Sequence, residues 1–178
     1  LANWKAKMGD KVADEIRDTA AARGTAMHTY LEHYLDGTGY KDLTPLGIQA
    51  ETMANKIIAA GLGDLEELWG LETTLYYPDL YAGATDVVGV YGGQPAIIDF
   101  KQSNKPKRRE WIMDYFEQLG AYTMAHNQVY GTKIQSGIVL MCTKDFLFQK
   151  FEVSGREFVR HQHAFLRKVD QYYKNVSK

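Results

Sequence analysis

The sequence predicts a layered α/β fold, in which a central mixed β-sheet is flanked by helices. Apolar residues recur at helical spacing over residues 9–35 and 48–60. After Leu68 the pattern changes to short segments rich in Tyr, Val, Ile and Thr, and these are typical of strands. Helical and strand patterns then alternate to the end of the chain. Because 178 residues can bury one sizeable core, we expect a single domain spanning 1–178.

The first half of the chain is predicted to contain two helices. The first covers residues 9–35, and Gly37 lies beyond its end as a stop signal. Arg23-Gly24-Thr25 could interrupt this helix, with Thr25 capping a second segment. The next helix covers residues 48–60 and ends at Gly61-Leu62-Gly63.

Three strands are predicted next, over residues 69–77, 81–91 and 96–101. Gly92-Gly93 predicts a hairpin between the second and third. A basic loop leads to a helix over 110–126, strands over 135–142 and 146–153, and a last helix that Ser154 and Glu157 open as a capping box. The order is αβββαβ, with an extra strand and a C-terminal helix.

The bulk composition limits the classes of function. A net charge of −1 argues against coating nucleic acid through an overall positive field, so a nucleic-acid site has to be local. The single cysteine, Cys142, excludes a four-cysteine iron–sulfur cluster within one chain. The sequence shows no run of roughly 18 apolar residues and no targeting segment, which predicts a cytoplasmic protein, in the host cytoplasm for a phage product. We expect no membrane partner, and no oligomer is implied.

Asp99 and Lys101 are the most informative pair of polar residues. They stand two apart on the strand predicted over 96–101, so both point to the same face. One interpretation is a surface ion pair where the strand emerges into solvent. The other is catalytic: Asp99 binds a divalent cation, and Lys101 contacts the attacking water or the scissile phosphate.

Asp86 lies on the neighbouring predicted strand. Pairing about the Gly92-Gly93 turn sets residues whose numbers sum to 185 opposite each other, so a simple register places Asp86 across from Asp99. Two adjacent carboxylates repel and raise each other's pKa unless a cation lies between them. The pairing therefore predicts a metal site.

Five motifs follow one another along the chain. They are Gly24-x3-His28-x3-Glu32, Glu72, Gly83-x2-Asp86, Asp99-x-Lys101 and Gln118-x3-Tyr122. Over about residues 4–142 this order resembles the PD-(D/E)XK nuclease superfamily, in particular the mitochondrial and phage exonucleases of its RecB-like branch. The resemblance implies a restriction-endonuclease-like core and a Mg²⁺- or Mn²⁺-dependent deoxyribonuclease.

The resemblance also implies which residues bind metal. One or two Mg²⁺ or Mn²⁺ ions are expected on His28, Asp86, Asp99 and the backbone carbonyl of Phe100. Some relatives carry an iron–sulfur cluster on four cysteines, which this sequence cannot form.

The remaining matched residues are expected to support the reaction. Lys101 positions or activates water, and Gln118 and Tyr122 brace the site, so the catalytic set comprises these three residues with Asp86 and Asp99. Glu32 is expected to orient His28 or a metal-bound water. Glu72 either touches the metal region or sits on an edge strand.

The predicted DNA path is the basic segment after the third strand, together with an arginine of the first helix. Its members are Arg23, Lys105, Lys107, Arg108, Arg109 and Trp111. A solvated basic loop is the alternative interpretation. A small basic channel in a non-basic chain favours a single strand over a duplex, so the expected function is degradation of single-stranded DNA from an end. The alternatives are a nuclease-like module that binds without cutting, and an RNA or structure-specific endonuclease.

Overall fold

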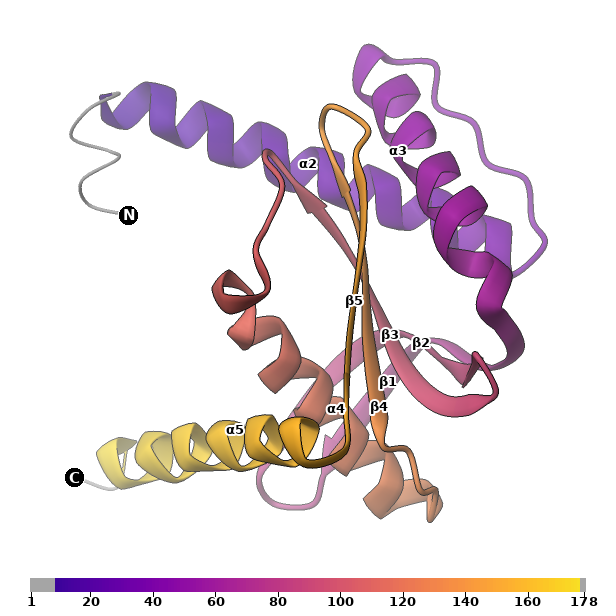
Figure 1. Cartoon of the computed structure of the whole chain (residues 1–178). Coiled ribbons are helices and arrows are strands. Elements are labelled where there is room, and N and C mark those ends of the chain that lie inside the picture. Colours follow the sequence, from indigo (N-terminus) through magenta and orange to yellow (C-terminus); the bar gives the residue numbers. More distant parts are fainter. Residues whose placement is uncertain (1–8, 177–178) are drawn as a thin grey trace.

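A five-stranded mixed sheet forms the centre of the computed structural model, which describes residues 9–176 (Figure 1). The strands are β1 (Leu65–Tyr77), β2 (Tyr81–Tyr91), β3 (Gln94–Ser103), β4 (Ser136–Thr143) and β5 (Phe148–Ser154), and they lie in that order across the sheet. Among these strands β3 and β4 run parallel, and the other neighbours are antiparallel. The predicted α/β class with a mixed sheet is confirmed. Residues 1–8 and 177–178 of the predicted domain lie outside the described residues.

Helices cover both faces of the sheet. α2 (Asp10–Leu35) and α3 (Pro45–Gly61) pack on one face, and α4 (Met113–Tyr130) and α5 (Gly155–Val176) lie on the other side (Figure 1). Alternate residues of β3 supply the two cores, since Ile98 packs with Met27 of α2 whereas Ile97 packs with Phe116 of α4. None of the helices within residues 9–176 is long and apolar enough to cross a membrane.

The β2–β3 hairpin has the predicted turn and register. Gly92 and Gly93 have φ values of 56° and 75°, which residues without a Cβ adopt at little cost. The pairs run from Tyr91 opposite Gln94 to Val87 opposite Ile98, and each pair of numbers sums to 185. The register that the predicted metal site requires is therefore confirmed as far as Val87.

α2 continues through Arg23-Gly24-Thr25 without the interruption considered from the sequence. Gly24 instead allows α2 to approach β3 closely, because a Cβ added there would lie 3.1 Å from Cγ of Gln102 on β3. The neighbouring Arg23 is buried and bonds to Gln102 and Asn104, so contacts distant in sequence outweigh the weak helix propensity of glycine.

Several boundaries differ from those predicted. α3 begins at Pro45 because Thr44 caps it, its side chain accepting a hydrogen bond from the Gly47 N–H at 3.0 Å. A 3₁₀ turn, η2 (Arg109–Trp111), precedes α4, so that helix begins at Met113 rather than residue 110. Glu157, predicted to close a capping box with Ser154, instead forms an ion pair with Arg109 at 2.9 Å.

Candidate active site

Asp86 and Asp99 are held together where the β2–β3 ladder ends. One residue beyond the last pair, Asp86 Oδ2 accepts a hydrogen bond from the backbone N–H of Phe100 at 2.6 Å. Both aspartates are buried, with 8% and 4% of their surfaces exposed. The side chain of Asp86 thus takes the place of a ladder bond and holds its carboxylate beside β3.

His28 reaches this place from α2. Its Nδ1 lies 3.2 Å from Asp86 Oδ1, and its Nε2 lies 2.8 Å from the carbonyl oxygen of Phe100. Burial acts to lower the pKa of His28, but the hydrogen bond and charge of Asp86, with the charge of Asp99, outweigh burial and raise it. The predicted ligands His28 and Asp86 and the Phe100 carbonyl therefore meet at one point.

Glu72 of β1 joins the same group. One ligand atom from each of His28, Glu72 and Asp86 lies within 4.8 Å of the others, a spacing that a single cation can bridge. Partial burial, followed by the charges of Asp86 and Glu32, raises the pKa of Glu72. Its φ of 47° is rare for a residue with a side chain, and such strain, roughly 1–3 kcal/mol, is typical of functional sites.

Asp99 and Lys101 form a buried ion pair beside this group. Lys101 Nζ lies 2.6 Å from Asp99 Oδ2, which accepts no well-directed hydrogen bond from the described part of the chain. Burial raises the pKa of Asp99 to about 6, with the charge of Asp86 adding to the effect and that of Lys101 opposing it. For Asp86 burial acts in the same direction, but the hydrogen bond and charge of His28 outweigh it and lower the pKa. The two carboxylates therefore differ in their tendency to hold a proton.

Gln118 and Tyr122 of α4 hold Lys101 in place. Lys101 Nζ donates to Gln118 Oε1 at 3.2 Å, and Gln118 Nε2 donates to the Tyr122 hydroxyl at 2.8 Å. Gly83 of β2 leaves room for this ring, since a Cβ there would lie 2.8 Å from Tyr122 Cε1. The Gly83, Asp99-x-Lys101 and Gln118-x3-Tyr122 motifs thus meet in one network.

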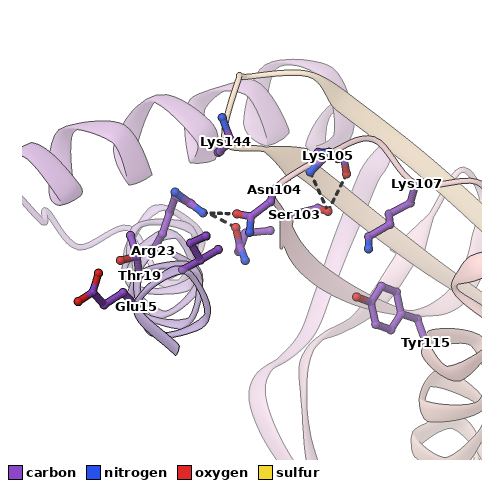
Figure 2. Close-up of a pocket in the computed structure, with 11 residues that line it drawn as sticks. Glu15, Thr19, Arg23, Ser103, Asn104, Lys105, Lys107, Tyr115 and Lys144 are labelled. Atoms are coloured by element: carbon purple, nitrogen blue, oxygen red, sulfur yellow. Dashed lines mark hydrogen bonds between the residues drawn. The ribbon is translucent and has the colours of Figure 1, made fainter. Parts of the chain in front are cut away.

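A groove of about 950 Å³ opens next to this network (Figure 2). α2, the segment after β3, the start of α4 and the β4–β5 turn form its walls; its charged lining residues are Glu15, Arg23, Lys105, Lys107 and Lys144. Arg23 is held by hydrogen bonds to Gln102 Oε1 at 3.2 Å and Asn104 Oδ1 at 2.5 Å. Tyr115 connects the groove to the ion pair, because it lines the wall and its ring centre lies 5.1 Å from Lys101 Nζ.

Sequence reasoning missed Lys144, which lies in the turn between β4 and β5. Parallel pairing sets Thr143 opposite Ser103, and the Lys144 N–H donates to the Ser103 carbonyl at 2.8 Å. Lys144 therefore shares the groove with Lys105 and Lys107. The sequence alone does not indicate that Lys144 lies at the groove, because this position depends on β4 being the parallel neighbour of β3.

Three residues of the predicted DNA path lie outside the groove lining. Arg109 bonds both oxygens of Glu157, at 2.9 and 3.0 Å, and the Glu152 carbonyl, so its guanidinium joins η2 to α5 and β5. Arg108 lies over the ring of Trp111 at 5.3 Å, and both are exposed. We therefore omit Arg109 from the proposed path and treat the Arg108–Trp111 pair as an outer surface.

The residues present fit a divalent cation. An imidazole and carboxylates suit Mn²⁺ as well as Mg²⁺, and a backbone carbonyl adds a hard oxygen ligand. The close approach of the Glu72 and Asp86 carboxylates gathers negative charge that a cation would balance.

Comparison with known proteins points in the same direction. No protein-family model matches the chain. Mitochondrial genome maintenance exonuclease 1 of Xenopus tropicalis is 28% identical over 156 residues, which cover 82% of this chain and 44% of that protein. The Homo sapiens protein of the same name is 33% identical over 90 residues, 47% of this chain and 26% of that protein. The chain thus spans less than half the length of these curated relatives.

A solved structure supplies the fold comparison. The crystal structure of a candidate exonuclease from Eubacterium rectale superposes with a TM-score of 0.61, covering 89% of this chain and 66% of that chain at 16% identity. At 16% identity, this superposition shows a shared fold alone; the relatives found by sequence are named as exonucleases. These similarities support the predicted resemblance to the PD-(D/E)XK nucleases. In the present fold, β2 carries Asp86 and β3 carries the Asp99-x-Lys101 motif.

Proposed function

We propose that the chain is a metal-dependent DNA exonuclease that hydrolyses phosphodiester bonds in single-stranded DNA from an end. The observation that carries the proposal is the convergence of His28, Glu72 and Asp86 ligand atoms within 4.8 Å, beside the Asp99–Lys101 ion pair. Similarity to mitochondrial genome maintenance exonuclease 1 supports nuclease activity on DNA.

The first role of the site residues is to hold the metal. His28, Asp86 and Asp99, with the Phe100 carbonyl and Glu72, would hold one or two Mg²⁺ or Mn²⁺ ions. Such an ion lowers the pKa of bound water and stabilises charge on the phosphate.

Lys101 acts on the reacting phosphate. Its side chain is 21% exposed, and its ammonium lies 5.1 Å from the ring centre of Tyr115 in the groove wall, where it can orient the nucleophile or neutralise charge on the scissile group. Gln118 keeps the ammonium facing that point through the 3.2 Å hydrogen bond.

The groove supports a single strand as substrate. Arg23, Lys105, Lys107 and Lys144 line it with one acidic residue, Glu15. Asp145 pairs with Lys144 at 2.9 Å, so the positive side chains still outnumber the negative ones and a phosphate backbone is the ligand that the charge favours. Tyr115 offers an aromatic face next to Lys101.

Cleavage of end-labelled strands tests the proposal. With Mn²⁺ the chain should shorten linear single-stranded DNA, spare a circular strand of the same composition, and lose activity in EDTA. Matched RNA should be cut more slowly. Cutting of the circle would instead favour an endonuclease, and faster cutting of RNA would favour a ribonuclease.

Lys101→Ala separates cutting from binding. The variant should lose about 10²- to 10³-fold in kcat yet bind DNA normally, whereas the exposed-lysine control Lys133→Ala should match wild type. Binding without cleavage by the wild type itself would favour the non-catalytic module.

A further inference from the structure

α5 carries a stripe of basic side chains on one face. Arg156, Arg160, His163 and Arg167 are all exposed. At about 100° per residue they fall within about 60° of arc, and they extend over about 16 Å of helix. In a chain of net charge −1, this is a local concentration of positive charge.

The nearby acidic residues do not neutralise these arginines. Glu157 is paired with Arg109 at 2.9 Å, and Glu117 with Lys168 at 2.5 Å. Asp170 is paired with Lys174 at 2.6 Å. Within residues 9–176, the stripe arginines 156, 160 and 167 form no ion pair. The stripe is therefore open to an external anion.

The other side of α5 is used by the fold. Phe158 is buried in the core that α4 shares, and the ring of Phe165 lies 4.8 Å from that of Tyr81. An amphipathic helix that inserts into lipid needs a free apolar face. Along the stripe, the apolar side of α5 packs on the protein through Phe158 and Phe165, and exposed apolar residues such as Tyr172 and Val176 lie beyond the stripe, nearer the end of the helix. Exposed arginines with no free apolar face beside them are suited to bind a polyanion. They contact its phosphates and release the counterions bound there.

The stripe lies next to the outer surface beyond the groove. Arg160 lines a hollow with Met113 and Glu117 of α4. Met113 follows the η2 turn that ends at Trp111, whose ring lies under Arg108. Exposed basic and aromatic side chains thus lie on the chain segment that joins Lys107 in the groove wall to Met113 in the hollow beside α5.

We propose that the basic stripe of α5 is a second DNA-binding surface, which holds the phosphate backbone of a strand outside the groove. The proposal rests on the proposed function, because it assigns more of the same substrate to this face. A second surface on α5 makes the affinity for DNA depend on the length of the strand. A strand that only fills the groove does not reach α5, whereas a longer strand does.

Binding in EDTA, where the strand is not cut, tests this surface. The variant is Arg160→Gln with Arg167→Gln, and the control is Lys56→Gln with Lys133→Gln, which removes two exposed charges elsewhere. Glutamine keeps a helix propensity close to that of arginine, and circular dichroism verifies folding. Fluorescence anisotropy with single strands of about 6 and about 30 nucleotides, over a range of salt, gives affinity and salt slope.

The stripe variant should bind the longer strand about 10-fold more weakly, with a salt slope flatter by about 1.4, or about 0.7 per lost phosphate contact. Its affinity for the short strand should stay within about twofold of wild type, as should both affinities of the control. Equal losses at both lengths, or no loss relative to the control, would overturn the proposal. So would unchanged DNA binding with weakened binding to phosphatidylserine vesicles. Failure of the wild type to cleave with Mn²⁺ would count against the proposed function alone, since this measurement needs no cleavage.

Discussion

Asp86 accepts a hydrogen bond from the backbone N–H of Phe100 at 2.6 Å, so one carboxylate both ends the β2–β3 ladder and faces the candidate metal site. The opposite side of the same peptide segment serves His28, since the Phe100 carbonyl lies 2.8 Å from its Nε2. The backbone of β3 thereby sets the positions of two proposed ligands on two other elements.

Asp86→Asn should separate these two roles. An asparagine oxygen can still accept from Phe100 N–H, so the melting temperature should stay close to wild type, while Mn²⁺ binding measured by calorimetry should fall sharply. Asp86→Leu leaves the buried N–H without a partner, which costs roughly 1–3 kcal/mol, and should lower both. Strong Mn²⁺ binding by the Asn variant would remove Asp86 from the ligand set.

Glu72→Gln should weaken Mn²⁺ binding about 10- to 100-fold, the range seen when a group that supports a metal site is removed. The reason is the approach of its carboxylate to His28 and Asp86 within 4.8 Å. Glu67→Gln changes an exposed glutamate of the same strand and should leave the titration unaltered. Equal Mn²⁺ affinities for the two variants would show that Glu72 does not bind the metal and only lies on an edge strand.

Gln118→Leu should lower kcat about 10- to 100-fold with little change in KM, because Lys101 loses the acceptor that positions its ammonium. Gln118→Glu keeps an acceptor and should be more active than the Leu variant. Steady-state kinetics on short single strands gives both constants. Gln128→Leu, an exposed position on the same helix, is the control. Inactivity of both Gln118 variants with lowered stability would indicate a purely structural role.

Stability should depend on pH through His126. Burial lowers the pKa of His126 below its ordinary value of 6.5, so the folded state favours the neutral ring. The unfolded state then binds more protons, and the free energy of unfolding should fall as the pH drops from about 7 through 6.5 toward 5. Denaturant titrations of His126→Gln should show a smaller fall than wild type, whereas the exposed control His163→Gln should follow wild type. An identical fall in all three would place the effect elsewhere.

Local rules in the sequence determined the fold class and part of the site. Side chains alternate between the two faces of a strand, so Asp99 and Lys101 point to the same face. Gly92-Gly93 defined the turn whose register brings Asp86 toward Asp99. Helical spacing likewise placed Gln118 and Tyr122 one turn apart. These inferences need only neighbours along the chain or across a two-residue turn.

The tertiary structure decided the rest, because it depends on contacts between residues far apart in the chain. Arg23 bonds to Gln102 across 79 positions, which keeps α2 continuous, and His28 meets Phe100 across 72. Arg109 is drawn to Glu157 across 48 positions, and the parallel β3–β4 pairing brings Lys144 into the groove. Such pairings follow from how the helices pack on the sheet, which no local pattern in the sequence specifies.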